Sequence, residues 1–201
     1  MRPGGLLRAV AFLSVPAAWA HAGFASGACL FLVCGAVMGI RWLGYRPDAD
    51  AAACLVLLAA AWAAVTGLYE VVPGLDLLAH VAGTAVATAA VWQALRRLDP
   101  AAGSPNPWVR AVLLVGVAAM LSVLWEVGEW LGHHLVDQTI RVGYDDTVTD
   151  LLAGLLGGGI VALLPDPASS RAPNPAPPNP APPNPAPPPS APSTPSPQEA
   201  R

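Results

Sequence analysis

The chain has 201 residues, of which 54% are hydrophobic and 11% are charged. About a quarter of the residues in soluble domains are charged, so this composition excludes an ordinary water-soluble fold and favours a protein embedded in a lipid bilayer. The formal net charge is −3, and the ten basic residues, all of them arginines, form no basic patch that would bind nucleic acid. The three cysteines lie in apolar runs and predict no disulfide framework.

The hydrophobic residues form six runs, each near the length of about 20 residues that a helix needs to cross about 30 Å of hydrocarbon. Segments rich in proline and glycine, such as GYRPDAD, VVPGLD and LDPAAGSPNP, separate several runs. The predicted fold class is therefore all-α, a polytopic membrane helix bundle occupying residues 1–165. Its predicted spans are about residues 6–24, 25–43, 51–72, 75–95, 108–131 and 147–164.

The first run has two interpretations. It follows Arg2 and Arg8 and ends in AWAHA, as a cleavable signal peptide would. We expect it to be a retained transmembrane helix, kinked at Pro16, because the following runs all span the membrane; cleavage near residue 22 is the alternative. The remaining spans keep the same orientation in either case.

The arginines predict the orientation. In the six-span topology only Arg141 lies on one side, and by the positive-inside rule both termini are then cytoplasmic in a multi-pass protein of the cell membrane. The arginines on the other side include Arg2, Arg8, Arg41, Arg46, Arg96, Arg97, Arg110 and Arg171.

Residues 166–201 differ in composition from the rest of the chain. They repeat PNPAP, and because proline fixes φ and lacks an amide donor, we expect disorder or extended polyproline II without a core. The expected role is that of a solvated cytoplasmic tail, with a proline-binding protein partner as the alternative. The sequence leaves the oligomeric state open.

Ionisable residues gather at the predicted extracytoplasmic end. Asp76 and His80 begin span four and are four residues apart, so they are neighbours on their helix. Glu126, Glu129 and His133, near the end of span five, lie within about 60° of arc at 100° per residue. The other members of this polar cluster are Asp137, Arg141, Asp145, Asp146 and Asp150.

Small residues continue the same helix faces toward the membrane centre. The face of Asp150 continues as Gly154 and Gly158, which form a small-xxx-small pattern. The face of His80 continues through Thr84 and Thr88. Small side chains allow membrane helices to approach closely, so spans four, five and six are expected to pack together with their polar ends converging.

Four interpretations of this cluster remain open. Carboxylates and histidine suit a divalent metal ion such as Zn²⁺ or Mn²⁺; the paired carboxylates also suit general acid–base chemistry on a headgroup or cell-wall precursor. A proton or cation path has less support, because spans one to three contain no mid-membrane charge. The fourth interpretation is a structural latch between helices. Candidate metal ligands are His80, Glu126, Glu129, His133 and Asp150, and candidate catalytic residues are Glu126, Glu129 and Asp150.

Arg141 is the one arginine expected at the extracytoplasmic end. Its guanidinium would either neutralise the acidic cluster or clamp a phosphate or carboxylate ligand. The sequence does not decide whether the protein is an enzyme.

Over about residues 70–160, three motifs follow one another in the same order as in a known family. They resemble the YjdF-like family of bacterial inner-membrane proteins, and the Asp76-x-x-x-His80 helix before an acidic helix pair is also similar to VanZ-like proteins. The resemblance implies a polytopic α-helical inner-membrane protein and supplies no reaction; VanZ-like proteins are associated with glycopeptide resistance, which points to the cell envelope. The motifs are Glu126-x-x-Glu129-Trp130, Asp145-Asp146-Thr147-x-x-Asp150-Leu151 and the glycine-rich helix through Gly157 and Gly158.

Overall fold

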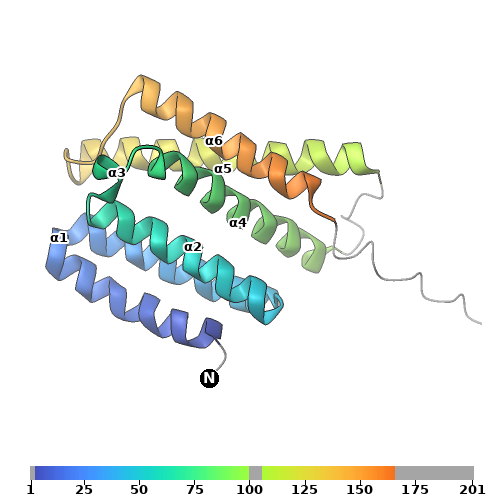
Figure 1. The fold of residues 1–201 in the computed structure, drawn as a ribbon, viewed down its shortest axis with the longest axis horizontal. Helices are drawn as coiled ribbons and strands as arrows, with labels where there is room; N and C mark the ends of the chain where they lie inside the picture. Colours follow the sequence, from blue (N-terminus) through green and yellow to red (C-terminus); the bar gives the residue numbers. More distant parts are fainter. Residues whose placement is uncertain (1–2, 100–105, 166–201) are drawn as a thin grey trace, which may run out of the picture. The chain divides into compact units, whose positions relative to one another are not determined.

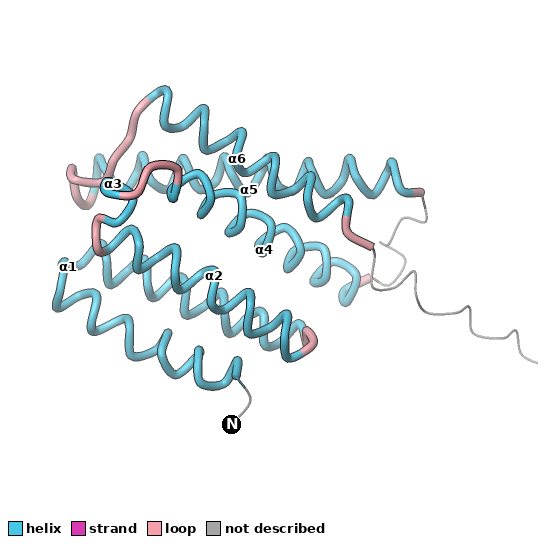
Figure 2. Tube along the Cα trace, viewed as in Figure 1, coloured by secondary structure: helices cyan, strands magenta, loops and turns pink. Residues whose placement is uncertain are grey.

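The computed structural model describes residues 3–99 and 106–165, so the proline-rich tail lies outside the described residues. Within these ranges the chain is helical and has no strand (Figure 2), which confirms the all-α prediction. Five of these helices are long and apolar enough to cross a membrane, and α3 is a single short turn. The helices are α1 (Pro3–Leu43), α2 (Pro47–Val65), α3 (Leu68–Val71), α4 (Leu75–Leu98), α5 (Pro107–Leu135) and α6 (Tyr144–Leu163).

Helix α1 turns back on itself near its middle. The backbone leaves the helical region at Ala22 and Gly23, where φ of Gly23 is +86°, a conformation that glycine adopts without steric cost. The Arg8 Nε donates to the Val37 carbonyl at 3.0 Å, whereas a straight helix would separate these residues by about 43 Å at 1.5 Å per residue. The two halves are therefore antiparallel neighbours (Figure 1) and correspond to the first two predicted runs, while Pro16 stays inside continuous helix.

The third predicted span, 51–72, is corrected to α2 followed by α3. Helix α2 ends at Val65, where the Thr66 hydroxyl donates to the Trp62 carbonyl at 2.7 Å. Gly67 then adopts φ +70° and Gly74 adopts φ +77°, so the chain turns twice before α4 begins. Helices α4 and α5 are both longer than the predicted spans 75–95 and 108–131.

Helices α4, α5 and α6 pack closely, as the small-residue pattern predicts. A Cβ added to Gly157 would overlap the Val81 carbonyl oxygen of α4 and lie 3.1 Å from the Ala85 amide nitrogen. A Cβ added to Gly158 would overlap the Ala118 side chain of α5. Glycine therefore brings the backbone of α6 against both neighbours.

Arginine side chains close the helix ends opposite the α5–α6 loop; we call this the arginine end. Arg97 Nη1 donates to the Trp42 carbonyl in the last turn of α1 at 2.9 Å. Arg110 Nη1 donates to the carbonyls of Ala162 and Leu164 at the end of α6, at 3.0 and 3.1 Å. These contacts satisfy carbonyls that have no intrahelical donor and place positive charge at the negative end of the helix dipole.

Arg8 forms a buried ion pair with Asp50 at the same end. Its Nη1 donates to Asp50 Oδ2 at 2.9 Å and its Nη2 donates to Oδ1, so the pair is bidentate. The two side chains are only 10% and 13% exposed. Together with the Arg8 contact to Val37, the pair joins both halves of α1 to α2.

We predict that Asp50→Ala lowers the free energy of unfolding by about 3 kcal/mol, because it leaves the Arg8 charge buried without its partner. Unfolding in detergent, followed by circular dichroism, measures this change. The matched control is Asp48→Ala, which breaks the exposed 3.2 Å pair with Arg46 and should lower the free energy of unfolding by about 1 kcal/mol at most. Equal losses in both variants would contradict the assignment.

Candidate functional site

Asp76, His80 and Asp150 come together between α4 and α6, and we call them the Asp–His–Asp group. His80 Nε2 lies 3.6 Å from Asp76 Oδ1 and 3.7 Å from Asp150 Oδ2. One ligand atom from each residue lies within 4.8 Å of the other two. Asp76 and His80 reach the same point because they are one helical turn apart on α4.

Asp150 and His80 lie below the surface of the bundle, whereas the Asp76 side chain is 30% exposed. Asp150 is the seventh residue of α6, which places it about 9 Å along the helix axis from Tyr144 at 1.5 Å per residue. Asp150 is 3% exposed, and the His80 side chain is 13% exposed. The Trp125 ring of α5 covers His80 edge-on, with ring centroids 6.4 Å apart. A carboxylate this buried requires a compensating charge or hydrogen bonds.

Gly154, one turn beyond Asp150, fixes how closely α6 approaches its neighbours. A Cβ at this position would overlap the Ser122 hydroxyl of α5 and lie 3.3 Å from Thr84 Oγ1 of α4. The absence of a side chain here therefore allows Asp150 to reach His80.

Glu126 and Glu129 lie near the group without belonging to it. The Glu126 charge acts on the Asp150 carboxyl, and the Asp76 and Asp150 charges act on Glu129. The Trp125 side chain hydrogen-bonds Glu129. These carboxylates therefore make the surroundings of the group strongly acidic.

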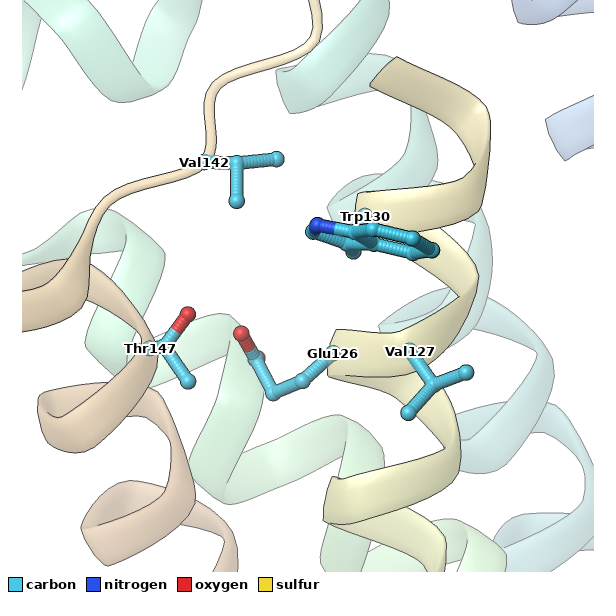
Figure 3. A pocket seen from close by; sticks show the side chains of 5 residues that line it. All are labelled: Glu126, Val127, Trp130, Val142 and Thr147. Carbon is cyan, nitrogen blue, oxygen red and sulfur yellow. The ribbon is translucent and has the colours of Figure 1, made fainter. Parts of the chain in front are cut away.

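The Glu126 side chain extends toward α6 in a groove between α5 and α6 (Figure 3). The groove has a volume of about 200 Å³, whereas sites for drug-sized ligands occupy about 300–1,000 Å³. It is thus too small to enclose such a ligand. Its lining residues are Glu126, Val127, Trp130, Val142 and Thr147.

The structure places His133 in the last turn of α5 and Asp137 in the α5–α6 connection, both outside the group. His133 Nδ1 lies 2.7 Å from the Ile140 carbonyl oxygen. Helix α5 ends at Leu135, so Asp137 does not continue its acidic face. Instead, Asp137 Oδ1 accepts from the Thr139 amide at 2.9 Å and from its hydroxyl at 2.7 Å, and these bonds lower the pKa of Asp137.

The remaining predicted residues lie just before α6, at Arg141, and in its first turn, at Asp145 and Asp146. Arg141 and Asp145 are exposed, whereas Asp146 is half-buried and its charge acts on the Asp150 carboxyl. Of these three, only Asp146 has a described interaction with the group.

Tyr69 of α3 is a neighbour of the cluster that sequence reasoning missed. Its hydroxyl donates to the Ala60 carbonyl at 2.7 Å, and the charges of Asp76 and Glu129 act on it. Burial, reinforced by these charges, raises its pKa well above the usual value. The position of Tyr69 could not be predicted because residues 51–72 have the composition of one continuous span. Gly67 is the residue in that span that could have indicated a turn.

A family model described as a predicted membrane protein matches residues 5–167. The chain belongs to this family, DUF2238. Membership in a family of predicted membrane proteins fits the resemblance to YjdF-like proteins and agrees with the long apolar helices. No curated protein and no solved structure matches the chain.

We predict that Gly157→Ala separates α6 from α4 and destabilises the bundle, because the added methyl group would overlap the Val81 carbonyl. The melting temperature in detergent should fall. Gly159→Ala is the matched control, since an added Cβ there meets no atom within 4 Å. An equal melting temperature for the two variants would show that α6 does not pack on α4 as described.

Proposed function

We propose that this multi-pass membrane protein binds a divalent metal ion, such as Zn²⁺ or Mn²⁺, through Asp76, His80 and Asp150. The supporting observation is the spacing of their ligand atoms: His80 lies 3.6 and 3.7 Å from the two carboxylates. Tetrahedral Zn²⁺ with ligands at about 2.05 Å holds neighbouring ligand atoms about 3.4 Å apart. An ion therefore fits with small side-chain movements.

The charge balance also supports a cation. Asp76 and Asp150 flank one imidazole, and a protonated imidazole would balance only one of these two carboxylates when both are ionised. A divalent ion would compensate the buried Asp150 directly. Three protein ligands leave a coordination position open, and Glu126 or Glu129 would fill it or act as a base beside a bound water.

In this proposal the site faces the outside of the cell membrane. The two halves of α1 each cross the bilayer, giving six spans, and the arginine end and both termini are cytoplasmic. The Asp76-x-x-x-His80 helix before an acidic helix, which is also the VanZ-like arrangement, supports a role at the cell envelope by analogy.

A structural latch is the second candidate function. His80 lies between two carboxylates from α4 and α6, so a protonated imidazole would link the two helices by charge alone. The two candidates differ in whether Asp150→Asn removes a metal ion or only weakens the bundle.

We predict that the purified protein in mild detergent contains one divalent metal ion per chain, and that His80→Ala and Asp150→Asn both lose it. Elemental analysis of each preparation measures the metal content. The matched control is Asp145→Asn, an exposed carboxylate on the same helix, which should retain the ion.

Melting temperatures of the same variants separate the two candidates. A wild-type protein without metal, together with a large loss of stability in Asp150→Asn, would overturn the metal site and favour the latch.

A further inference from the structure

The groove between α5 and α6, which we call the α5–α6 groove, contains a carboxylate without a partner of opposite charge. The Glu126 side chain extends into the groove (Figure 3). Among residues 3–99 and 106–165 its carboxylate forms no hydrogen bond and no ion pair, and the nearby charges of Glu129 and Asp150 have the same sign. A carboxylate among apolar side chains is costly until a cation or a donor pairs with it. The groove therefore suits a ligand that carries positive charge.

An aromatic ring lies beside this carboxylate. Trp130 is one helical turn beyond Glu126 on α5, and Figure 3 shows its ring edge-on above the Glu126 side chain, so that a ring face is turned toward the carboxylate. His134, in the next turn, packs against Trp130 with ring centroids 4.4 Å apart. The face of an indole ring attracts cations through its quadrupole. The carboxylate and the ring face together form a site that favours an ammonium group.

A positive charge lies beside the same groove. Arg141 directly precedes Val142, which lines the groove, and its side chain is exposed. Its guanidinium forms no ion pair within the part of the chain that the structure describes. Guanidinium groups bind phosphate oxygens through paired hydrogen bonds. A ligand with an ammonium group and a phosphate group would therefore find a partner for each charge.

The α5–α6 groove is open along the side of the bundle. Val127 is 47% exposed, Trp130 is 50% exposed and Val142 is 37% exposed. Thr147, in the first turn of α6, also lines the groove, and tryptophan is enriched where the hydrocarbon core meets the lipid headgroups. The groove is too small for a drug-sized ligand, but a lipid would place only its headgroup there, because its acyl chains stay in the bilayer. These features favour an amphiphile as the occupant.

The acceptors in the groove favour a primary ammonium group. The Glu126 carboxylate and the Thr147 hydroxyl both extend into the groove (Figure 3). A primary ammonium group has three N–H donors for such oxygens, whereas a quaternary ammonium group has none. Hydrogen bonding therefore distinguishes ethanolamine from choline headgroups, although both would be attracted by Trp130.

We propose that the α5–α6 groove binds the headgroup of a phosphoethanolamine lipid. Glu126 and Thr147 accept hydrogen bonds from the primary ammonium group, Trp130 covers it, and Arg141 pairs with the phosphate. The proposal requires no metal ion, and Glu129 remains available for the open coordination position of the metal site.

Lipids that differ only in N-methylation test the proposal. Phosphatidylethanolamine, its monomethyl and dimethyl derivatives and phosphatidylcholine, all with the same short acyl chains, are titrated into the purified protein in mild detergent, and native mass spectrometry measures bound lipid. The affinity should fall as N–H donors are removed. Repeating the titration with EDTA removes binding of the phosphate through a metal ion. Equal affinity for the first and last lipids, or a preference that disappears with EDTA, would overturn the proposal.

Variants of the groove locate the bound lipid. Glu126→Gln should lower the affinity for phosphatidylethanolamine about tenfold and remove the preference over phosphatidylcholine, because it loses a charged hydrogen bond. Arg141→Gln should weaken both lipids by the same factor, since they share the phosphate. The matched control is Glu70→Gln, an exposed carboxylate of α3 outside the groove, which should bind like wild type.

Thr147→Val, which keeps the shape but removes the hydroxyl group, is the second test if Glu126→Gln does not fold. It should reduce the preference for phosphatidylethanolamine several-fold. A full preference in Thr147→Val, or in a folded Glu126→Gln, would overturn the proposal. Asp150→Asn, which should lose any bound metal, should keep the preference, so failure of the metal site would leave this result unchanged.

Discussion

The close approach of α6 to α4 is the contact on which the rest of the structure depends. Gly157 lacks the side chain that would hold the two backbones apart, Gly154 leaves room for the side chains of Ser122 of α5 and Thr84 of α4, and Gly158 leaves room for Ala118 of α5. With the backbones this close, the short side chain of Asp150 reaches His80. Larger residues at these positions would move Asp150 outward and separate the Asp–His–Asp group into solitary buried charges, which a membrane protein tolerates poorly.

The charges of the described chain are divided between its two ends. At one end arginines close the C-termini of α1 and α6 and pair with Asp50. At the other end carboxylates gather around one histidine. Burying a single charge is costly; the arginines meet this cost by binding helix carbonyls, and Asp76 and Asp150 lie beside His80.

Helical periodicity was sufficient to predict the apolar helices in outline and the close packing of α4, α5 and α6, because small residues continue the same faces. It did not single out Asp76 as the neighbour of His80 and Asp150. It could not predict the turn at Gly67, where one residue in the left-handed region ends an unbroken apolar run and places Tyr69 beside the cluster. It could not assign His133 to the Ile140 carbonyl, since that contact depends on the path of a loop. Arg8 and Asp50 are 42 positions apart, and only the folded bundle pairs them.

The most direct test of the account is disulfide cross-linking between α4 and α6 in native membranes. The variant carries His80→Cys and Asp150→Cys, with Cys29, Cys34 and Cys54 replaced by serine; the control carries Leu78→Cys, on an exposed face of α4, with Asp150→Cys. The account predicts rapid cross-linking of the first pair under mild oxidation and none of the control. No cross-link in the first pair, or equal cross-linking in both, would contradict the contact between α4 and α6 that creates the site.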